Sequence, residues 1–368
     1  AEKFFLDGMT QAMHCLAEQA HPAFPVTIYY AFKQTETGSA AVSAAKAKSV
    51  TETGSAAVSA AKAKSVQDAR APRSTGWETF LEAVMQAGFA LTGTWPIRTE
   101  RSGGLRNLEQ NALASSIVLV CRCRGESASL ATRGQFMTAL KRELPEALRL
   151  LQHGNVAPVD LAQAAIGPGM AVFSRHAKVI EPDGSPMRVR TALALINEVL
   201  DEFLAQQEGE FDADTRWALT WFQQHGMEEG PYGDAETLST AKDTSVQGMT
   251  EAGFLKARAG KVRLLGRGEL DPHWDPTKDT RLTVWEITQH LIHALESEGE
   301  AAAARLVRQV GHYAEIARDL AYRLYTVCER KGWAQEAIAY NSLVIAWPEI
   351  TKLAAGMEMR GGIQAELL

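Results

Sequence analysis

The 368-residue sequence has few cysteines and no long apolar run. Its strongest apolar stretch, IVLV at 117–120, is far shorter than the roughly 20 residues that a membrane-spanning helix needs. The four cysteines are scattered, and Cys121 and Cys123 form CxC instead of the CxxC spacing of a zinc ribbon or redox site. We therefore expect reduced thiols, a cytoplasmic location and no membrane partner.

The first twenty residues, AEKFFLDGMTQAMHCLAEQA, lack the charged-then-apolar layout of a signal peptide. Apolar residues recur there at helical spacing, which predicts an amphipathic helix: Phe5, Met9, Ala12, Met13 and Leu16. A chain that opens inside a helix suggests a fragment whose beginning lies upstream.

The net charge of −6 is unevenly distributed. Residues 97–190 carry 13 Lys/Arg against 8 Asp/Glu, whereas residues 191–253 carry 2 against 13. A basic stretch beside an acidic one is compatible with nucleic-acid contact. Solvated helix faces would give the same balance.

The first 125 residues alternate between helical and strand patterns. A strand pattern occupies 26–32, VTIYYAF, and its apolar residues on both sides predict cover on two faces. A helix is expected over 76–89, closed by Gly88. Two further strands, 90–95 and 115–123, are expected to pair antiparallel at the sheet edge. This order predicts an incomplete doubly wound α/β sheet.

One sixteen-residue unit, TETGSAAVSAAKAKSV, is repeated without change at 35–66. It has no apolar face on which copies could stack, and solenoids need at least three copies. Exposed loops tolerate insertions because closure entropy grows slowly with length. We interpret 35–73 as a low-complexity duplicated loop; the functional alternative is a lysine-bearing flap that touches a phosphate backbone.

Beyond Thr132 the patterns become helical, so a mainly α region is predicted for 126–368, with Pro145 interrupting its first helix. The segment 235–266 differs, because it reads as helix, turn, short helix and a hairpin with Gly260 at its tip. That order matches a winged-helix insert, whose second helix and wing often contact DNA. A purely structural unit is the alternative.

Several long stretches resemble one known family: VTIYYAFKQ, GWETFLEAVMQAGFALTGTWPIRTE, NALASSIVLVCR, LKRELPEALRLLQHGNVAPVDLAQAAIGPGMAVFSR, MRVRTALALINEVLDEFL, RLTVWEITQHLIHALE and LAYRLYTVCERKGWAQEA. They are similar to the C-terminal portion of large adenine-specific DNA methyltransferases, the family that has an N-terminal domain of unknown function and an inserted zinc ribbon. The resemblance covers nearly the whole chain apart from 35–73.

The resemblance implies an S-adenosylmethionine-dependent enzyme that flips adenine out of the stack and methylates its exocyclic amine. The family's two reaction motifs, a Gly-rich strand-to-helix turn and a (D/N)PP(Y/F) turn, are absent and lie upstream in the family. The closest candidate, IGPGMA at 166–171, lacks a preceding strand. We therefore expect no catalytic residue here, and S-adenosylmethionine only in the intact enzyme.

The expected partners are DNA and either the upstream catalytic half of the same protein or a separate catalytic subunit. A non-catalytic DNA-binding or scaffold subunit is the alternative function. A helical interaction protein descended from the enzyme is another.

In this family the loop between the last two strands reaches the target-base pocket. The resemblance thus points to Trp95, Arg98, Glu100, Arg101, Arg106 and Asn111, and to Tyr29, Tyr30 and Lys33 near the end of the first strand. Trp95 would stack on a base and the arginines would contact phosphate. The structural alternatives are a core position for Trp95 and a surface ion pair between Arg98 and Glu100. The loop departs from the family at Glu109-Gln110, where Gly-Thr is usual.

Two histidines, His290 and His293, share one helix face at i, i+3 spacing. No cysteine or further histidine is placed nearby in the sequence, so no metal site is expected.

Overall fold

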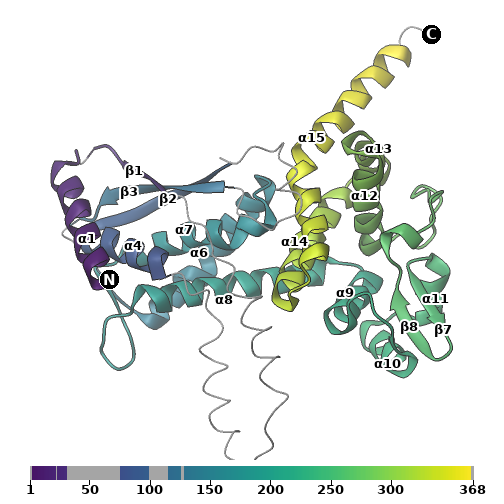
Figure 1. The fold of residues 1–368 in the computed structure, drawn as a ribbon, viewed down its shortest axis with the longest axis horizontal. Helices are drawn as coiled ribbons and strands as arrows, with labels where there is room; N and C mark the ends of the chain where they lie inside the picture. Colours follow the sequence, from purple (N-terminus) through teal and green to yellow (C-terminus); the bar gives the residue numbers. More distant parts are fainter. Residues whose placement is uncertain (1, 22, 31–74, 99–114, 126–127, 366–368) are drawn as a thin grey trace, which may run out of the picture. The chain divides into compact units, whose positions relative to one another are not determined.

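The computed structural model describes residues 2–21, 23–30, 75–98, 115–125 and 128–365. They form two compact units (Figure 1). The first unit comprises the described residues as far as 151 together with 160–201, and the second comprises 152–159 and the residues from 202 onward. No helix within the described ranges is long and apolar enough to span a membrane.

The first unit is built on a three-stranded sheet of β1 (Val26–Tyr30), β2 (Phe89–Arg98) and β3 (Ser115–Cys123). The strand order is β1-β3-β2, and β3 runs antiparallel to both neighbours. β1 and β2 therefore run parallel to each other with the last strand between them. On its other side, β1 pairs with no strand of the described residues.

β2 continues three residues beyond the strand expected at 90–95. Pro96, Ile97 and Arg98 pair with Ile117, Ser116 and Ser115, so the segment expected to begin a loop is strand. Proline is tolerated because β2 is an edge strand, where a missing N–H leaves no ladder bond unmade. The register shifts between Leu91 and Gly93, which places a β-bulge at Thr92.

Two helices cover one face of this sheet, as Figure 1 shows. From α4 (Thr75–Gln86), Trp77 and Phe80 lie against Tyr30 of β1, with ring centroids 4.7 and 4.5 Å away. From α7 (Pro158–Ser174), Gly167 packs on Thr94 of β2. The remaining helices of this unit are α1 (Glu2–Gln19), α6 (Arg133–His153) and the beginning of α8 (Val189–Gln207).

The expectation that β1 is covered on two faces is wrong for the described residues. Its burial alternates, and Tyr29 is 72% exposed while Tyr30 is packed against α4. The expected break at Pro145 is also wrong, because α6 runs through it without interruption. A parallel pair of three-residue strands, β4 (Leu130–Thr132) and β5 (Lys178–Ile180), was too short for its pattern to be read.

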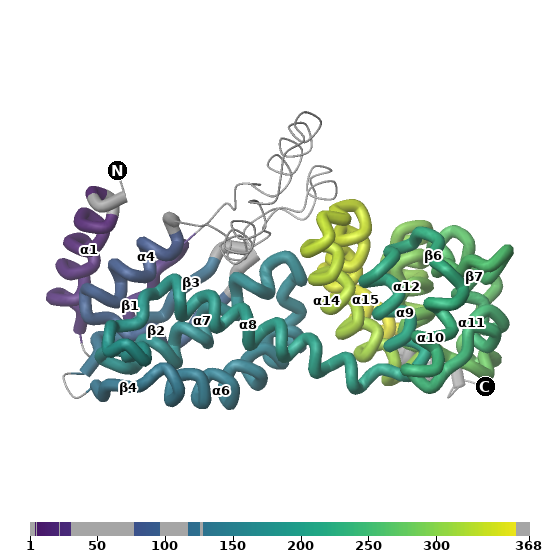
Figure 2. Tube along the Cα trace, turned by 90° about the horizontal axis from the view of Figure 1, so that it is seen from below, coloured from purple at the N-terminus to yellow at the C-terminus, as the bar shows by residue number. Residues whose placement is uncertain are grey.

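The second unit begins with a small mixed module that Figure 2 shows from below. Its elements are α9 (Ala213–His225), β6 (Gly230–Pro231), α10 (Tyr232–Lys242), α11 (Val246–Ala252), β7 (Leu255–Arg258) and β8 (Lys261–Leu264). The helix, turn, short helix and hairpin expected over 235–266 are thus present. The strand order is β6-β8-β7.

This module folds around buried aromatic and aliphatic side chains. Trp217 and Trp221 stack with centroids 5.2 Å apart, and Gly230 lets β6 pass directly over Trp221. Ala259 and Gly260 both have positive φ, which suits the two-residue turn between β7 and β8. The N-cap of α9 is Asp212, whose side chain accepts a hydrogen bond from the Thr215 amide.

Four helices complete the second unit: α12 (Val284–Glu298), α13 (Glu300–Val310), α14 (Tyr313–Lys331) and α15 (Ala334–Ala365). They pack on one another around large buried side chains that include Trp285, Tyr322, Tyr340 and Trp347. The Tyr340 hydroxyl donates to Glu336 and accepts from Gln289, so this core has a hydrogen-bonded centre.

Candidate nucleic-acid interface

Two exposed aromatic side chains lie in one row across the sheet of the first unit. The register pairs Tyr29 with Val118 on β3, and pairs Val118 with Trp95 on β2. Tyr29 is 72% exposed and Trp95 is 65% exposed, whereas Val118 between them is 5% exposed. Because paired strands are about 4.8 Å apart, the two aromatic residues are separated by about 10 Å.

Strand alternation explains why these residues face away from the helices. Tyr30, Leu119 and Thr94 occupy the face that α4 and α7 cover. Tyr29, Val118 and Trp95 therefore occupy the opposite face, which we call the open sheet face; no helix of the described residues packs there. The expectation that Trp95 could belong to the core is wrong.

The indole of Trp95 lies back along its own strand. A Cβ atom at Gly93 would lie 3.8 Å from Trp95 Nε1 and 3.9 Å from Val120 Cβ. The ring therefore lies beside the Gly93 backbone and near Val120. A flat aromatic surface of this kind can stack on a nucleic-acid base without sequence preference, and each stacked base contributes about 1–3 kcal/mol.

Two of the other predicted site residues lie in the described part of the chain. Tyr30 lies on the covered face, and Arg98 is the last residue of β2, paired with Ser115. Lys33, Glu100, Arg101, Arg106 and Asn111 lie outside the described residues. One cation that the sequence did not indicate, Arg122, shares the open sheet face and donates a hydrogen bond to the Ala23 carbonyl.

The glycines of IGPGMA are packing residues and do not form a cofactor turn. They lie inside α7, with Pro168 between them. A Cβ at Gly167 would overlap the Thr94 side chain, and one at Gly169 would come within 2.5–2.8 Å of Ile196. Both glycines are thus occupied in helix packing, Gly167 against a strand and Gly169 against a helix.

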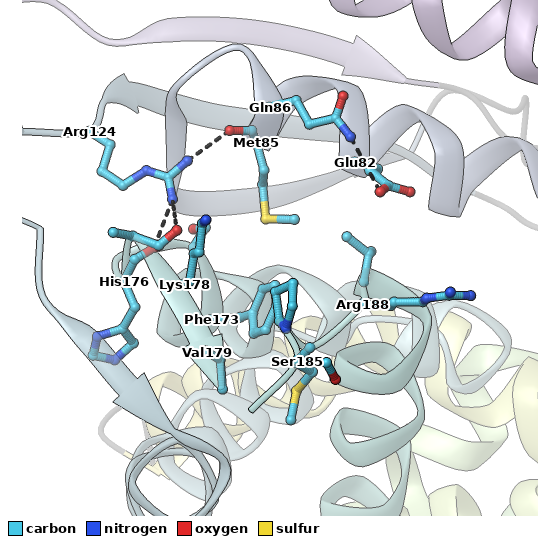
Figure 3. Close-up of a pocket in the computed structure, with 15 residues that line it drawn as sticks. Glu82, Met85, Gln86, Arg124, Phe173, His176, Lys178, Val179, Ser185 and Arg188 are labelled. Carbon is cyan, nitrogen blue, oxygen red and sulfur yellow. Dashed lines mark hydrogen bonds between the residues drawn. The ribbon is translucent and has the colours of Figure 1, made fainter. Parts of the chain in front are cut away.

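A cavity of about 580 Å³ lies between the end of α4, the end of α7 and β5 (Figure 3). Arg124 lies at one side of the cavity and donates to the carbonyl oxygens of Met85 and His176, both at 2.7 Å. Burial lowers the pKa of the Arg124 guanidinium. At the rim, Glu82 accepts from Gln86. Through these hydrogen bonds Arg124 ties the end of α4 to the segment that leads into β5. Because Arg124 is engaged in this way, the cavity is not our candidate site.

The two histidines of α12 do not form a metal site. The His290 ring stacks on Trp274 with centroids 4.1 Å apart, and burial lowers its pKa to about 4. Within the part of the chain that the structure describes, no three His, Cys, Asp or Glu side chains are placed to hold a metal ion.

Residues 212–367 match a family model described as a domain of unknown function, DUF8807. The match begins at the N-cap of α9 and thus contains the mixed module and the four-helix core, but not the open sheet face. No curated protein and no solved structure matches the chain.

Proposed function

We propose that this chain is the target-gripping part of an adenine-specific, S-adenosylmethionine-dependent DNA methyltransferase, and that the reaction motifs lie on other polypeptide sequence. The observation that carries the proposal is the open sheet face with Tyr29 and Trp95. It adjoins the end of β2, where the loop that reaches the target base would begin. An extruded adenine needs an aromatic or apolar surface to replace its stacking neighbours.

The edge of β1 that pairs with no strand in the described ranges also supports this proposal. β1 and β2 are parallel, and β1 presents the backbone groups of Val26–Tyr30 at the margin of the sheet. A doubly wound sheet of parallel strands could continue from that edge. The resemblance places the cofactor and catalytic strands there.

The stacking role predicts a specific loss of binding to single-stranded DNA. Trp95→Ala should weaken the binding of an adenine-containing single-stranded oligonucleotide about 5- to 150-fold, which corresponds to one lost stacking contact of about 1–3 kcal/mol. Tyr29→Ala should act in the same direction. Fluorescence anisotropy of a labelled oligonucleotide measures both effects.

Tyr313→Ala is the matched control, because Tyr313 is a partly exposed aromatic residue in the second unit. Its affinity should equal that of the wild-type chain. Equal binding by wild type, Trp95→Ala and Tyr29→Ala would refute the role of the open sheet face.

A calorimetric titration with S-adenosylmethionine tests whether the cofactor site lies on other polypeptide sequence. The purified chain alone should give no binding isotherm, and adenine methylation should appear only after addition of a polypeptide that carries both missing motifs. Stoichiometric cofactor binding by the chain alone would contradict the proposal.

A non-catalytic DNA-binding or scaffold subunit is the second candidate. The mixed module of the second unit favours it, because its element order is that of a winged helix and is independent of the sheet in the first unit. DNA binding without methylation, even in the presence of the motif-bearing polypeptide, would favour this candidate.

A further inference from the structure

The β7–β8 hairpin carries four cations in two directly opposed pairs. The register places Lys256 opposite Arg263 and Arg258 opposite Lys261. Leu255, Val262 and Leu264 are buried on the inner face, so strand alternation puts all four cations on the outer face. Like charges directly opposite each other destabilise a strand pair. Such an arrangement is unfavourable for folding and therefore suggests a binding role.

Two of these four cations have an ion-pair partner within the described residues. Arg263 forms two hydrogen bonds of 2.6 Å with Glu269, and Lys261 lies 3.0 Å from Glu229. The Arg263 hydrogen bond is the main reason that the pKa of Glu269 falls to about 2. Lys256 and Arg258 are exposed and form no ion pair or side-chain hydrogen bond in the described part of the chain. They stand two residues apart on one strand face, about 6.7 Å.

In a winged helix the second helix, here α11, would enter a DNA groove, but the side chains of α11 are poorly suited to that role. Its only charged residue is Glu251, which accepts a hydrogen bond from Gln247 at 2.8 Å, and these two residues are the exposed ones of the helix. Its first turn is covered by Arg281, since a Cβ at Gly248 would lie 2.7 Å from Arg281 Cζ.

Arg281 is itself fixed in this position. It donates to Asp214 of α9 at 2.7 and 3.0 Å and to Thr244 at 3.0 Å. A recognition helix must enter the major groove with side chains directed at base edges. With Arg281 over its first turn, α11 cannot do so unless this network opens.

We infer that the second unit contacts the phosphate backbone of duplex DNA through the outer face of the β7–β8 hairpin, with Lys256 and Arg258 as the principal contacts, and that α11 does not enter a groove. The inference rests on the proposed function, because it assumes that the chain grips DNA. Backbone contact of this kind positions the protein without reading sequence.

The salt dependence of binding tests the inference. Each phosphate neutralised on B-DNA contributes about −0.9 to the slope of log K against log salt concentration. For the intact chain and a labelled duplex, Lys256→Ala/Arg258→Ala should therefore make the slope less steep by about 1.8. Gln247→Ala should leave both slope and affinity unchanged. The control Arg305→Ala/Arg308→Ala removes the same charge from α13 and should also change neither.

Thermal unfolding separates a lost contact from a lost fold. The hairpin variant removes one member of each like-charge pair, so its melting temperature should equal or exceed that of the wild-type chain. Lys256→Gln/Arg258→Gln keeps the side-chain bulk and should reproduce the change in slope.

An unchanged slope in both hairpin variants, or a larger loss from Gln247→Ala, would overturn the inference. If the wild-type chain binds DNA while the hairpin variants bind equally well, the inference fails and the proposed function stands. If the wild-type chain binds neither duplex nor single-stranded DNA, both fail. Binding of an acidic polypeptide in preference to DNA would also refute the inference.

Discussion

Glu286 is a buried carboxylic acid, and its burial disfavours the charged form. It lies on α12 with 2% of its surface exposed, and one of its carboxyl oxygens has no hydrogen-bond partner among the described residues. Burial first, and then the nearby Asp279 carboxylate, raises its pKa to about 9 from the ordinary 4.5. Between these two pH values Glu286 is therefore protonated in the folded chain and ionised in the unfolded chain.

This proton makes stability fall as pH rises. Between the unfolded pKa and the folded pKa, the native state binds more protons, so the free energy of unfolding should decrease by up to about 1.4 kcal/mol per pH unit. Glu286→Gln keeps a neutral side chain of the same size. It should flatten this dependence and should be more stable than the wild-type chain at pH 8.

Urea unfolding of both chains at intervals from pH 7 to 8.5 measures the two slopes. Glu298→Gln is the control, because Glu298 is an exposed residue of the same helix that pairs with Arg305. A wild-type slope equal to that of Glu286→Gln would show that Glu286 is ionised in the folded protein.

Individual side chains were predictable where local pattern determines them. Alternation along 26–30 required that Tyr29 and Tyr30 face opposite ways, but it could not tell which face the helices cover. That choice depends on Trp77 and Phe80, almost fifty residues later in the chain. The contact of Trp274 with His290 was likewise not predictable, because Trp274 lies in an irregular segment without a periodic pattern.

At the scale of elements, α7 depends on a glycine to approach α8. Gly169 faces Ile196, which is fully buried, and a methyl group there would come within 2.5–2.8 Å of three Ile196 side-chain carbons. Alanine normally stabilises a helix interior by about 1 kcal/mol relative to glycine. Here Gly169→Ala should instead destabilise the protein by about 1–3 kcal/mol, because the added carbon overpacks the contact.

A double-mutant cycle identifies the cause. Ile196→Ala alone should cost about 2–5 kcal/mol through the cavity that it leaves. The double variant should be at least about 1 kcal/mol more stable than the sum of the two single changes predicts, since the new methyl group enters that cavity. Additive effects in urea unfolding would show that Gly169 is needed for another reason.

Element boundaries were predictable where apolar periodicity and end signals coincide. The strand at 115–123 agrees with the expected position. The helix expected over 76–89 begins within one residue of its expected start but ends at Gln86, and Phe89 already belongs to β2. The continuation of β2 through Pro96 was not predictable, because it depends on β3 supplying partners from its far end. The unbroken α6 at Pro145 is a similar case, since proline only biases a helix toward ending.

At the scale of the whole molecule, the resemblance predicted the order of helices and strands along the chain, and the structure shows which strands pair and in which direction. The antiparallel pair of final strands is present, and the last strand also joins β1. Which strands neighbour each other could not be derived from the order alone, because a strand after two others can join either edge or insert between them. That the sheet continues beyond β1 stays a prediction.

The first unit exposes large apolar side chains in addition to the edge of β1, which pairs with no strand of the described residues. Phe4, in the first turn of α1, is 86% exposed, and Phe24, two residues before β1, is 69% exposed. A strand edge that is neither paired nor protected is a template for association. Large exposed apolar side chains add a hydrophobic driving force for the same process.

We therefore predict that the chain alone self-associates through its first unit. Size-exclusion chromatography with light scattering should show a mass that rises with concentration, and Phe4→Ser/Phe24→Ser should shift the distribution toward the 40.0 kDa monomer. Leu150→Ser is the matched control, because Leu150 is 68% exposed on α6 in the same unit and lies far in sequence from β1. If any exposed apolar side chain of this unit promoted self-association, Leu150→Ser would shift the distribution toward the monomer as much as Phe4→Ser/Phe24→Ser does. A wild-type chain that stays monodisperse and melts cooperatively as a monomer at every concentration would refute the prediction, and it would mean that the β1 edge needs no further strand.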